Sequence, residues 1–160
     1  ICMKLLLRQQ PVARDLRVIS SALKMISDME RIGDQASDIV ELAQYIKKSD
    51  VKYKTHLSDM ANEVIKMVTK SIKSFVKKDI EMARNVIVYD DVVDNYFEEI
   101  KKELIRIISS GESDGEEFID ILMIAKYLER IGDHATNIAE WVEYAITGVH
   151  RNNEHQLGGH

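Results

Sequence analysis

The five-residue stretch Glu-Arg-Ile-Gly-Asp occurs twice in this 160-residue chain, at residues 30–34 and 129–133. Several flanking positions also match at the same offset, over residues 23–45 and 122–144. In both stretches apolar residues recur at intervals of three and four, which is the period of one face of an α-helix. An internal repeat implies two copies of one supersecondary unit. We therefore expect two related helical units.

Few residues in the chain can interrupt a helix, because it contains one proline and seven glycines. This scarcity favours long helices over a sheet, which needs more turn residues. The apolar period predicts the end of a helix at residues 1–8 and long helices near 11–47, 55–77, 80–109 and 116–147. Residues 49–54 and 111–115 are predicted to connect them. Expected caps are Thr55 or Ser58, Asp79, and Gly148.

Short connections between long helices make sequence neighbours pack antiparallel. The last three helices then form a complete three-helix bundle, and the first two resemble the end of another. We predict an all-α fold of tandem three-helix bundles. Its parts are a partial first repeat at residues 1–50, a second repeat at 51–149 and a flexible tail at 150–160. The other helices of the first repeat either precede this sequence or come from another chain.

Composition argues against several classes of protein. The net charge is −5 and no basic stripe is visible, so we expect no binding to nucleic acid. The single cysteine, Cys2, cannot form a disulfide within the chain, which fits a reducing compartment. Apolar runs are too short to cross a membrane. We therefore expect a cytoplasmic protein.

Acidic residues four apart lie on one face of a helix. Three such stripes occur: Glu30, Asp34 and Asp38; Asp90, Asp94 and Glu98; and Glu129 and Asp133 followed by Asn137. One such stripe alone is best interpreted as a solvated face. Repetition at matched positions favours a carboxylate metal site instead. Gly33 and Gly132 lie within these helices, where glycine costs about 1 kcal/mol relative to alanine, so a ligand or a second helix is expected to approach closely.

Patterns of known catalytic sites are missing from the sequence. No Glu-x-x-His occurs on these helices, as ferritin-like di-iron enzymes require. No glycine-rich phosphate loop and no nucleophile–histidine set is recognisable. His134 follows Asp133 but points about a quarter turn away from the stripe, and we interpret it as a surface residue. We expect no catalytic residues. A carboxylate-bundle metalloenzyme and a metal-independent helical adaptor remain alternatives.

Five stretches together resemble the PhoU family, with a resemblance that covers about residues 1–147. They are Gln9-Gln10-Pro11, Asp15-Leu16-Arg17, Asp90-Asp91-Val92-Val93-Asp94 and the two copies of Glu-Arg-Ile-Gly-Asp. The resemblance implies PhoU-like tandem bundles that bind iron or zinc, including multinuclear clusters, through E(D)xxxD motifs. The implied ligands are Asp90, Asp94, Glu129 and Asp133 in the second unit, and Glu30 and Asp34 in the first. The partner motif of the first-unit site is expected on helices that this sequence does not include.

The resemblance also implies a regulatory function. A PhoU-like protein is expected to repress phosphate uptake and phosphate-starvation signalling. It would dock between the ATPase subunit of a phosphate ABC transporter and a sensor histidine kinase. It would remain cytoplasmic, reach the membrane through these partners only, and form a homodimer.

Overall fold

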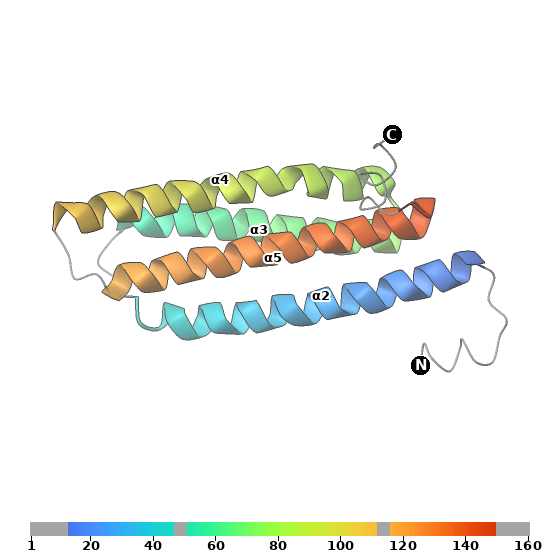
Figure 1. The fold of residues 1–160 in the computed structure, drawn as a ribbon, viewed down its shortest axis with the longest axis horizontal. Coiled ribbons are helices and arrows are strands. Elements are labelled where there is room, and N and C mark those ends of the chain that lie inside the picture. Colours follow the sequence, from blue (N-terminus) through green and yellow to red (C-terminus); the bar gives the residue numbers. More distant parts are fainter. Residues whose placement is uncertain (1–12, 47–50, 112–115, 150–160) are drawn as a thin grey trace, which may run out of the picture.

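The computed structural model describes residues 13–46, 51–111 and 116–149. These residues form the helices α2 (Ala13–Ala43), α3 (Val51–Lys77), α4 (Ile80–Ser110) and α5 (Glu116–Thr147), with no strand among them. The four helices run along one long axis, and each reverses the direction of the one before it (Figure 1). The predicted helix end at residues 1–8 and the predicted tail at 150–160 lie outside the described residues.

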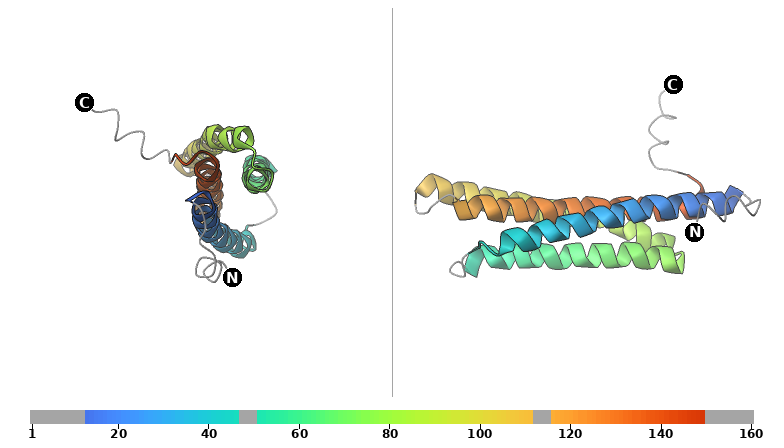
Figure 2. Two further views of the ribbon diagram at one scale, coloured as in Figure 1. Left: turned by 90° about the vertical axis from the view of Figure 1, so that its right-hand side faces the viewer. Right: turned by 90° about the horizontal axis from the view of Figure 1, so that it is seen from below.

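Helices α3, α4 and α5 form a three-helix bundle around an apolar core. Each helix contributes large side chains that are almost completely buried: Met60 and Met67 from α3, Val86 and Val93 from α4, and Ile138 and Val142 from α5. Helix α5 packs on all three other described helices and lies between α4 and α2 (Figure 2). An apolar stripe broad enough to serve three neighbours explains why α5 buries more residues than α2.

The helix ends confirm part of the sequence analysis. The Asp79 carboxylate accepts a hydrogen bond from the Met82 N–H at 2.9 Å and caps α4. Gly111 and Gly148 have φ values of 71° and 80°. This left-handed conformation ends a helix, and glycine adopts it with little strain because it has no Cβ atom.

The predicted start of α3 is wrong, because the helix begins at Val51 and Thr55 and Ser58 lie inside it. The stretch from residue 51 is polar, but it contains no glycine or proline, and polar composition alone does not prevent a helix.

Helix α2 ends at Ala43, shortly before the predicted Lys47, which lies outside the described residues. The all-α fold is confirmed, and the division into two units at residue 50 remains a prediction. No helix in the described ranges combines the length and the apolar composition that a membrane span requires.

Candidate functional site

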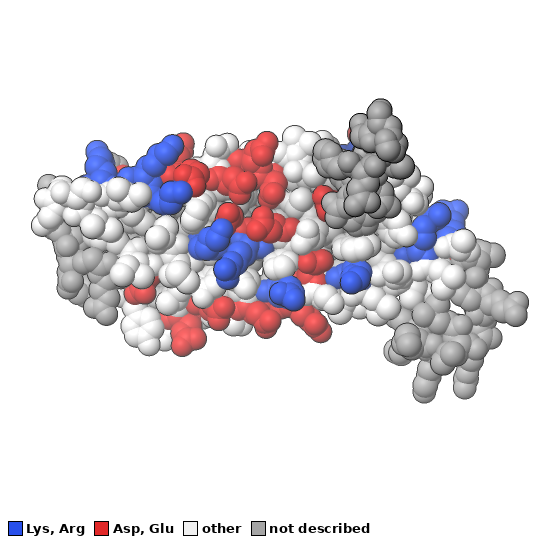
Figure 3. Space-filling model, viewed as in Figure 1, with Lys and Arg blue, Asp and Glu red and all other residues white. Residues whose placement is uncertain are grey.

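The structure brings the second-unit acids together where α4 packs against α5. Asp90 and Asp94 project from α4, and Glu129 and Asp133 project from α5. Because the two helices are antiparallel and both pairs are spaced by four residues, the pairs face each other over about one helical turn. We call these four side chains the carboxylate cluster. Figure 3 shows acidic side chains gathered over α4 near the middle of the molecule and again along α2, with basic side chains between them.

The three aspartates of the carboxylate cluster bind a proton more readily than ordinary carboxylates, because the pKa of each is raised. The pKa of Asp90 is raised to about 6, chiefly by burial and then by the charges of Asp94 and Asp133. Burial also raises the pKa of Asp94, with a further contribution from Glu129. The pKa of Asp133 is raised by burial and then by Glu129 and Asp94. Burial is the main cause of all three shifts and a neighbouring negative charge is the second, so these carboxylates are partly desolvated beside like charges, which is an environment that attracts a cation.

Asp90 has the least compensated oxygen of the cluster. Its Oδ1 is buried and has no hydrogen-bond partner. Thr136 Oγ1 lies near enough to oppose the rise in the pKa of Asp90, yet it too lacks a hydrogen bond of good geometry. A Cβ atom on Gly132 would lie 3.6 Å from Asp90 Oδ1 and 3.4 Å from Val93 Cγ1. Glycine at this position therefore leaves room beside a buried, unpaired acceptor, which calls for a water molecule or an ion.

Lys126 lies at the edge of the cluster. Its Nζ donates a hydrogen bond to Glu129 Oε2 on the same helix, and it lies 5.2 Å from the ring centre of Phe97 on α4. Neither Lys126 nor Thr136 was predicted from the sequence. The three-residue spacing from Lys126 to Glu129 was a usable signal. The proximity of Thr136 to Asp90 depends on how α4 crosses α5 and has no comparable sequence signal.

The donor set fits a cation that prefers oxygen ligands, since it offers four carboxylates, and that of Asp90 has a buried unpaired oxygen. As the side chains lie, no three His, Cys, Asp or Glu residues within the described ranges are arranged to hold a metal ion. Part of the reason is visible at Glu129, whose carboxylate is engaged by Lys126. Binding would require Glu129 to release Lys126 and the side chains to converge.

The first-unit residues Glu30 and Asp34 lie on an exposed face of α2. A Cβ atom on Gly33 would meet nothing within 4 Å, in contrast to Gly132. The nearby Ser37 hydroxyl donates a hydrogen bond to the Gly33 carbonyl of its own helix. Among the described residues no helix opposes this stripe, and a first-unit metal site remains a prediction.

Two further side chains of α5 face α2, namely His134, which lies next to the acidic stripe, and Asn137, which is the third position of the stripe. His134 Nδ1 donates a hydrogen bond to Asp28 Oδ1 at 2.9 Å, and Asn137 Nδ2 donates to the same oxygen at 3.3 Å. The side chains of His134 and Asp28 are only 18% and 13% exposed. The interpretation of His134 as a surface residue is therefore wrong, because α2 covers this side of α5. Glu98, third in the α4 stripe, pairs with Lys101 at 2.6 Å.

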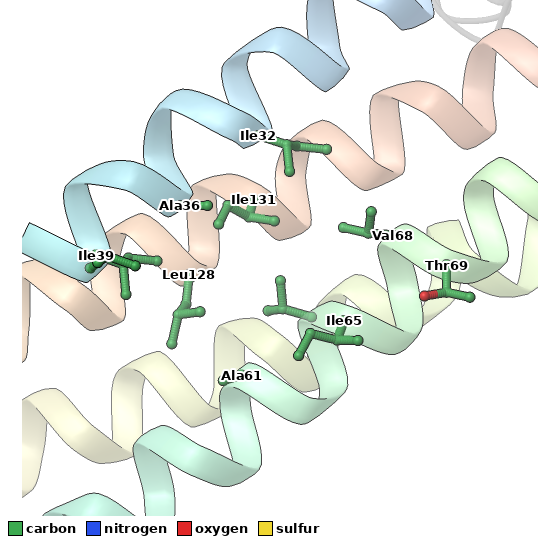
Figure 4. A pocket seen from close by; sticks show the side chains of 11 residues that line it. Ile32, Ala36, Ile39, Ala61, Ile65, Val68, Thr69, Leu128 and Ile131 are labelled. Carbon is green, nitrogen blue, oxygen red and sulfur yellow. The ribbon is translucent and has the colours of Figure 1, made fainter. Parts of the chain in front are cut away.

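A groove of about 380 Å³ lies between α2, α3 and α5 (Figure 4). Aliphatic side chains such as Ile39, Ile65 and Leu128 line it. Thr69 is the one lining residue with a polar side chain. The groove therefore lacks the acids, bases and nucleophiles that chemistry would require.

Comparison with known proteins shows one consistent similarity. A sequence profile described as the PhoU domain matches residues 1–43 and 57–142. The chain is 33% identical over 147 residues to the "phosphate-specific transport system accessory protein PhoU homolog 1" of Thermotoga maritima, covering 91% of this chain and 63% of that protein. The homolog of Clostridium acetobutylicum is 37% identical over 149 residues, covering 91% and 67%.

Two solved structures have the same fold. The crystal structure of PhoU from Pseudomonas aeruginosa superposes with a TM-score of 0.82 at 34% identity, over 92% of this chain and 72% of the other. PhoU from Streptococcus pneumoniae, described as a phosphate transport system regulatory protein, gives 0.85 at 26% identity, over 93% and 70%. The chain thus spans about two thirds of the length of the proteins it matches.

Proposed function

Because this chain belongs to the PhoU family, we propose that it is a regulatory protein that represses phosphate uptake and phosphate-starvation signalling, and not an enzyme. The relatives named as accessory proteins of phosphate-specific transport systems support this function. The matching fold over more than nine tenths of the chain supports it further. Since the chain spans about two thirds of those proteins, the activity and partners of the whole protein belong to the proposal.

We further propose that the carboxylate cluster binds iron or zinc. The observation that carries this proposal is the convergence of Asp90, Asp94, Glu129 and Asp133 from two helices, with an unpaired buried oxygen on Asp90. A bound cation would supply the positive charge that the cluster lacks. Asp90 would bind from the buried side, and Asp94 and Asp133 from the exposed side. Glu30 and Asp34 would form an equivalent site once a second acidic helix lies over α2.

Cation binding would change the charge of the α4–α5 surface, and we propose that this surface docks the partners. These are the ATPase subunit of a phosphate ABC transporter and a sensor histidine kinase, both reached from the cytoplasm. The protein would approach the membrane through them alone. A homodimer would cover exposed apolar side chains of α2 such as Leu23, Ile26 and Val40, which are 41%, 44% and 64% exposed. Sedimentation at several concentrations tests this last step.

The metal proposal is tested by elemental analysis of protein purified without chelator and then incubated with iron or zinc. We expect bound metal in the parent and its loss in the Asp94→Ala plus Asp133→Ala double variant. The matched control is Glu30→Ala plus Asp34→Ala, which removes the same charge from the same motif on α2 and should retain second-unit metal. A folded parent without metal would refute the cluster and leave a helical adaptor.

The partner proposal is tested by measuring binding of the purified ATPase subunit and of the cytoplasmic part of the kinase to immobilised protein, with metal and after chelation. We expect binding that depends on metal and is weakened by the Asp94→Ala plus Asp133→Ala variant. Partner binding that persists after complete loss of metal would mean that docking does not depend on metal in the carboxylate cluster. Binding of neither partner would count against the regulatory proposal itself.

A further inference from the structure

Lys126 is placed so that it can compete with a metal ion. The side chain leaves α5 one turn before Glu129 and its ammonium group pairs with the Glu129 carboxylate, one of the proposed ligands. It also lies over the ring of Phe97, on the α4 side of the cluster, at 5.2 Å from the ring centre. Cation–π contact of this kind holds an ammonium group near the site without using a carboxylate.

The charge of Lys126 acts on more than Glu129. Lys126 also lies close enough to Asp94 and Asp133 for its positive charge to act on both carboxylates. An ammonium group tethered to α5 thus offsets part of the negative charge that a bound ion would offset. Binding an ion and keeping the Lys126–Glu129 pair are therefore competing ways to neutralise the same side chains.

The internal repeat provides a comparison within the chain. The position that corresponds to Lys126 in the first repeat is Ser27, three residues before Glu30. Ser27 has no charge, and the Glu30 stripe on α2 is exposed and faces no second acidic helix in the described part of the chain. The lysine therefore occurs in the repeat in which α4 adds two more carboxylates, and not in the other.

We propose that Lys126 sets the affinity of the carboxylate cluster, as a built-in competitor that a metal ion must displace from Glu129. This inference rests on the proposed metal binding. In the metal-free protein Lys126 partly neutralises the cluster and keeps Glu129 engaged. When an ion binds, Lys126 leaves Glu129 and remains over Phe97. The lysine thereby raises the cation concentration at which the cluster fills.

The test is a titration of the metal-free protein with Zn²⁺ in the parent and in Lys126→Met, which retains an apolar chain of similar length over Phe97. We expect Lys126→Met to bind Zn²⁺ about tenfold more tightly, because one competing charge a few ångströms from the site has been removed. The Lys126 side chain is 39% exposed, so salt should screen its charge. The difference is accordingly expected to shrink in 1 M NaCl. The matched control is Lys73→Met, the same charge change on an exposed position of α3, which should leave the affinity unchanged.

A second measurement separates competition from loss of fold. Without metal, Lys126→Met should unfold at a lower temperature than the parent, and Zn²⁺ should raise its midpoint by more than it raises that of the parent. If this variant does not fold, Lys126→Gln removes the charge and retains a polar chain, with the same expected direction. Parent and variant binding Zn²⁺ equally, or the variant binding it more weakly, would overturn the role of Lys126 and leave the metal proposal standing. No Zn²⁺ binding in either would overturn both.

Discussion

Asp90 gains a proton more readily than an ordinary aspartate, since its pKa is raised to about 6, chiefly by burial. In the unfolded chain its pKa returns to about 3.9. Between these two values the folded state holds more protons than the unfolded state. The free energy of unfolding contributed by this residue therefore falls as pH rises from about 4 to 6 and remains low above that range.

This residue leads to a prediction for Asp90→Asn in chelator-treated protein. Asparagine resembles the protonated acid, so we expect the variant to be more stable than the parent at pH 7.5, by on the order of 2 kcal/mol. The advantage should disappear near pH 4. Urea unfolding at both pH values measures it, and saturating metal should reverse the order, because asparagine is the weaker ligand. A variant less stable than the metal-free parent at pH 7.5 would contradict the assignment.

The two mid-helix glycines lead to a prediction that the sequence repeat alone would not make. Gly33→Ala should stabilise the protein by about 1 kcal/mol, because alanine is the better helix former and its methyl group meets nothing within 4 Å. Gly132→Ala should fold as well, since its Cβ contacts lie at ordinary distances. Its methyl group would nevertheless occupy the space beside Asp90 Oδ1. Thermal unfolding and Zn²⁺ titration of both variants should show a loss of affinity in Gly132→Ala only.

The resemblance to the PhoU family implied that the four members of the carboxylate cluster form one site. Residue spacing alone predicted that the members on each helix share one face. It could not predict which face a second helix covers. The packing of α4 on α5 places Thr136 beside Asp90. The packing of α2 on α5 makes His134, which was expected to be a surface residue, a hydrogen-bond partner of Asp28. Helix packing also distinguishes the two glycines, because Gly132 packs on α4 whereas Gly33 faces open space.

Helix boundaries were predictable where the sequence has a residue that specifically caps a helix, either a side chain that accepts a hydrogen bond at the N-terminus or a glycine at the C-terminus. Asp79 and Gly148 are such residues. As expected, Asp79 begins α4 and Gly148 follows the end of α5. The start of α3 has no such residue. Its expected caps, Thr55 and Ser58, are compatible with the interior of a helix, and the helix extends through them to Val51.

The cap of α4 leads to a prediction about this element. Asp79→Ala removes the acceptor for the Met82 N–H at 2.9 Å and should reduce the free energy of unfolding by about 1 kcal/mol. Asp79→Ser retains an acceptor and is expected to lose much less. Urea unfolding of the two variants provides the measurement. Equal losses would mean that the negative charge at the helix N-terminus, rather than the hydrogen bond, makes the contribution.

Within the described part of the molecule, the helices differ in how many other helices they pack against. Helix α5 packs on every other described helix, and α3 and α4 also pack on each other, whereas α2 packs chiefly on α5. The buried residues of α2 are Ser21 and Met25, fewer than in α4. Large side chains of α2 such as Leu16, Leu23 and Val40 remain exposed. Local stability follows buried apolar contact, so α2 should detach from α5 at lower free energy than the bundle unfolds.

Hydrogen exchange measures this difference directly. Amides of α2 should exchange faster than those in the middle of α4 and α5. Asp28→Ala removes the acceptor shared by His134 and Asn137, two hydrogen bonds that join α2 to α5. Since each contributes about 0.5–1.5 kcal/mol, we expect α2 exchange to accelerate by about tenfold. Exchange in α3 and α4 should not change.

The control is Glu41→Ala, which removes an exposed carboxylate from the same helix and should leave exchange in α2 nearly unaltered. If Asp28→Ala instead accelerates exchange equally in all four helices, then α2 and the bundle open as one unit. The Asp28 contacts would in that case stabilise the whole fold. If only α2 responds, the acidic stripe of the first repeat lies on an element that can move relative to the carboxylate cluster. A bound partner or an additional helix could then reposition α2 while the bundle that carries the cluster stays folded.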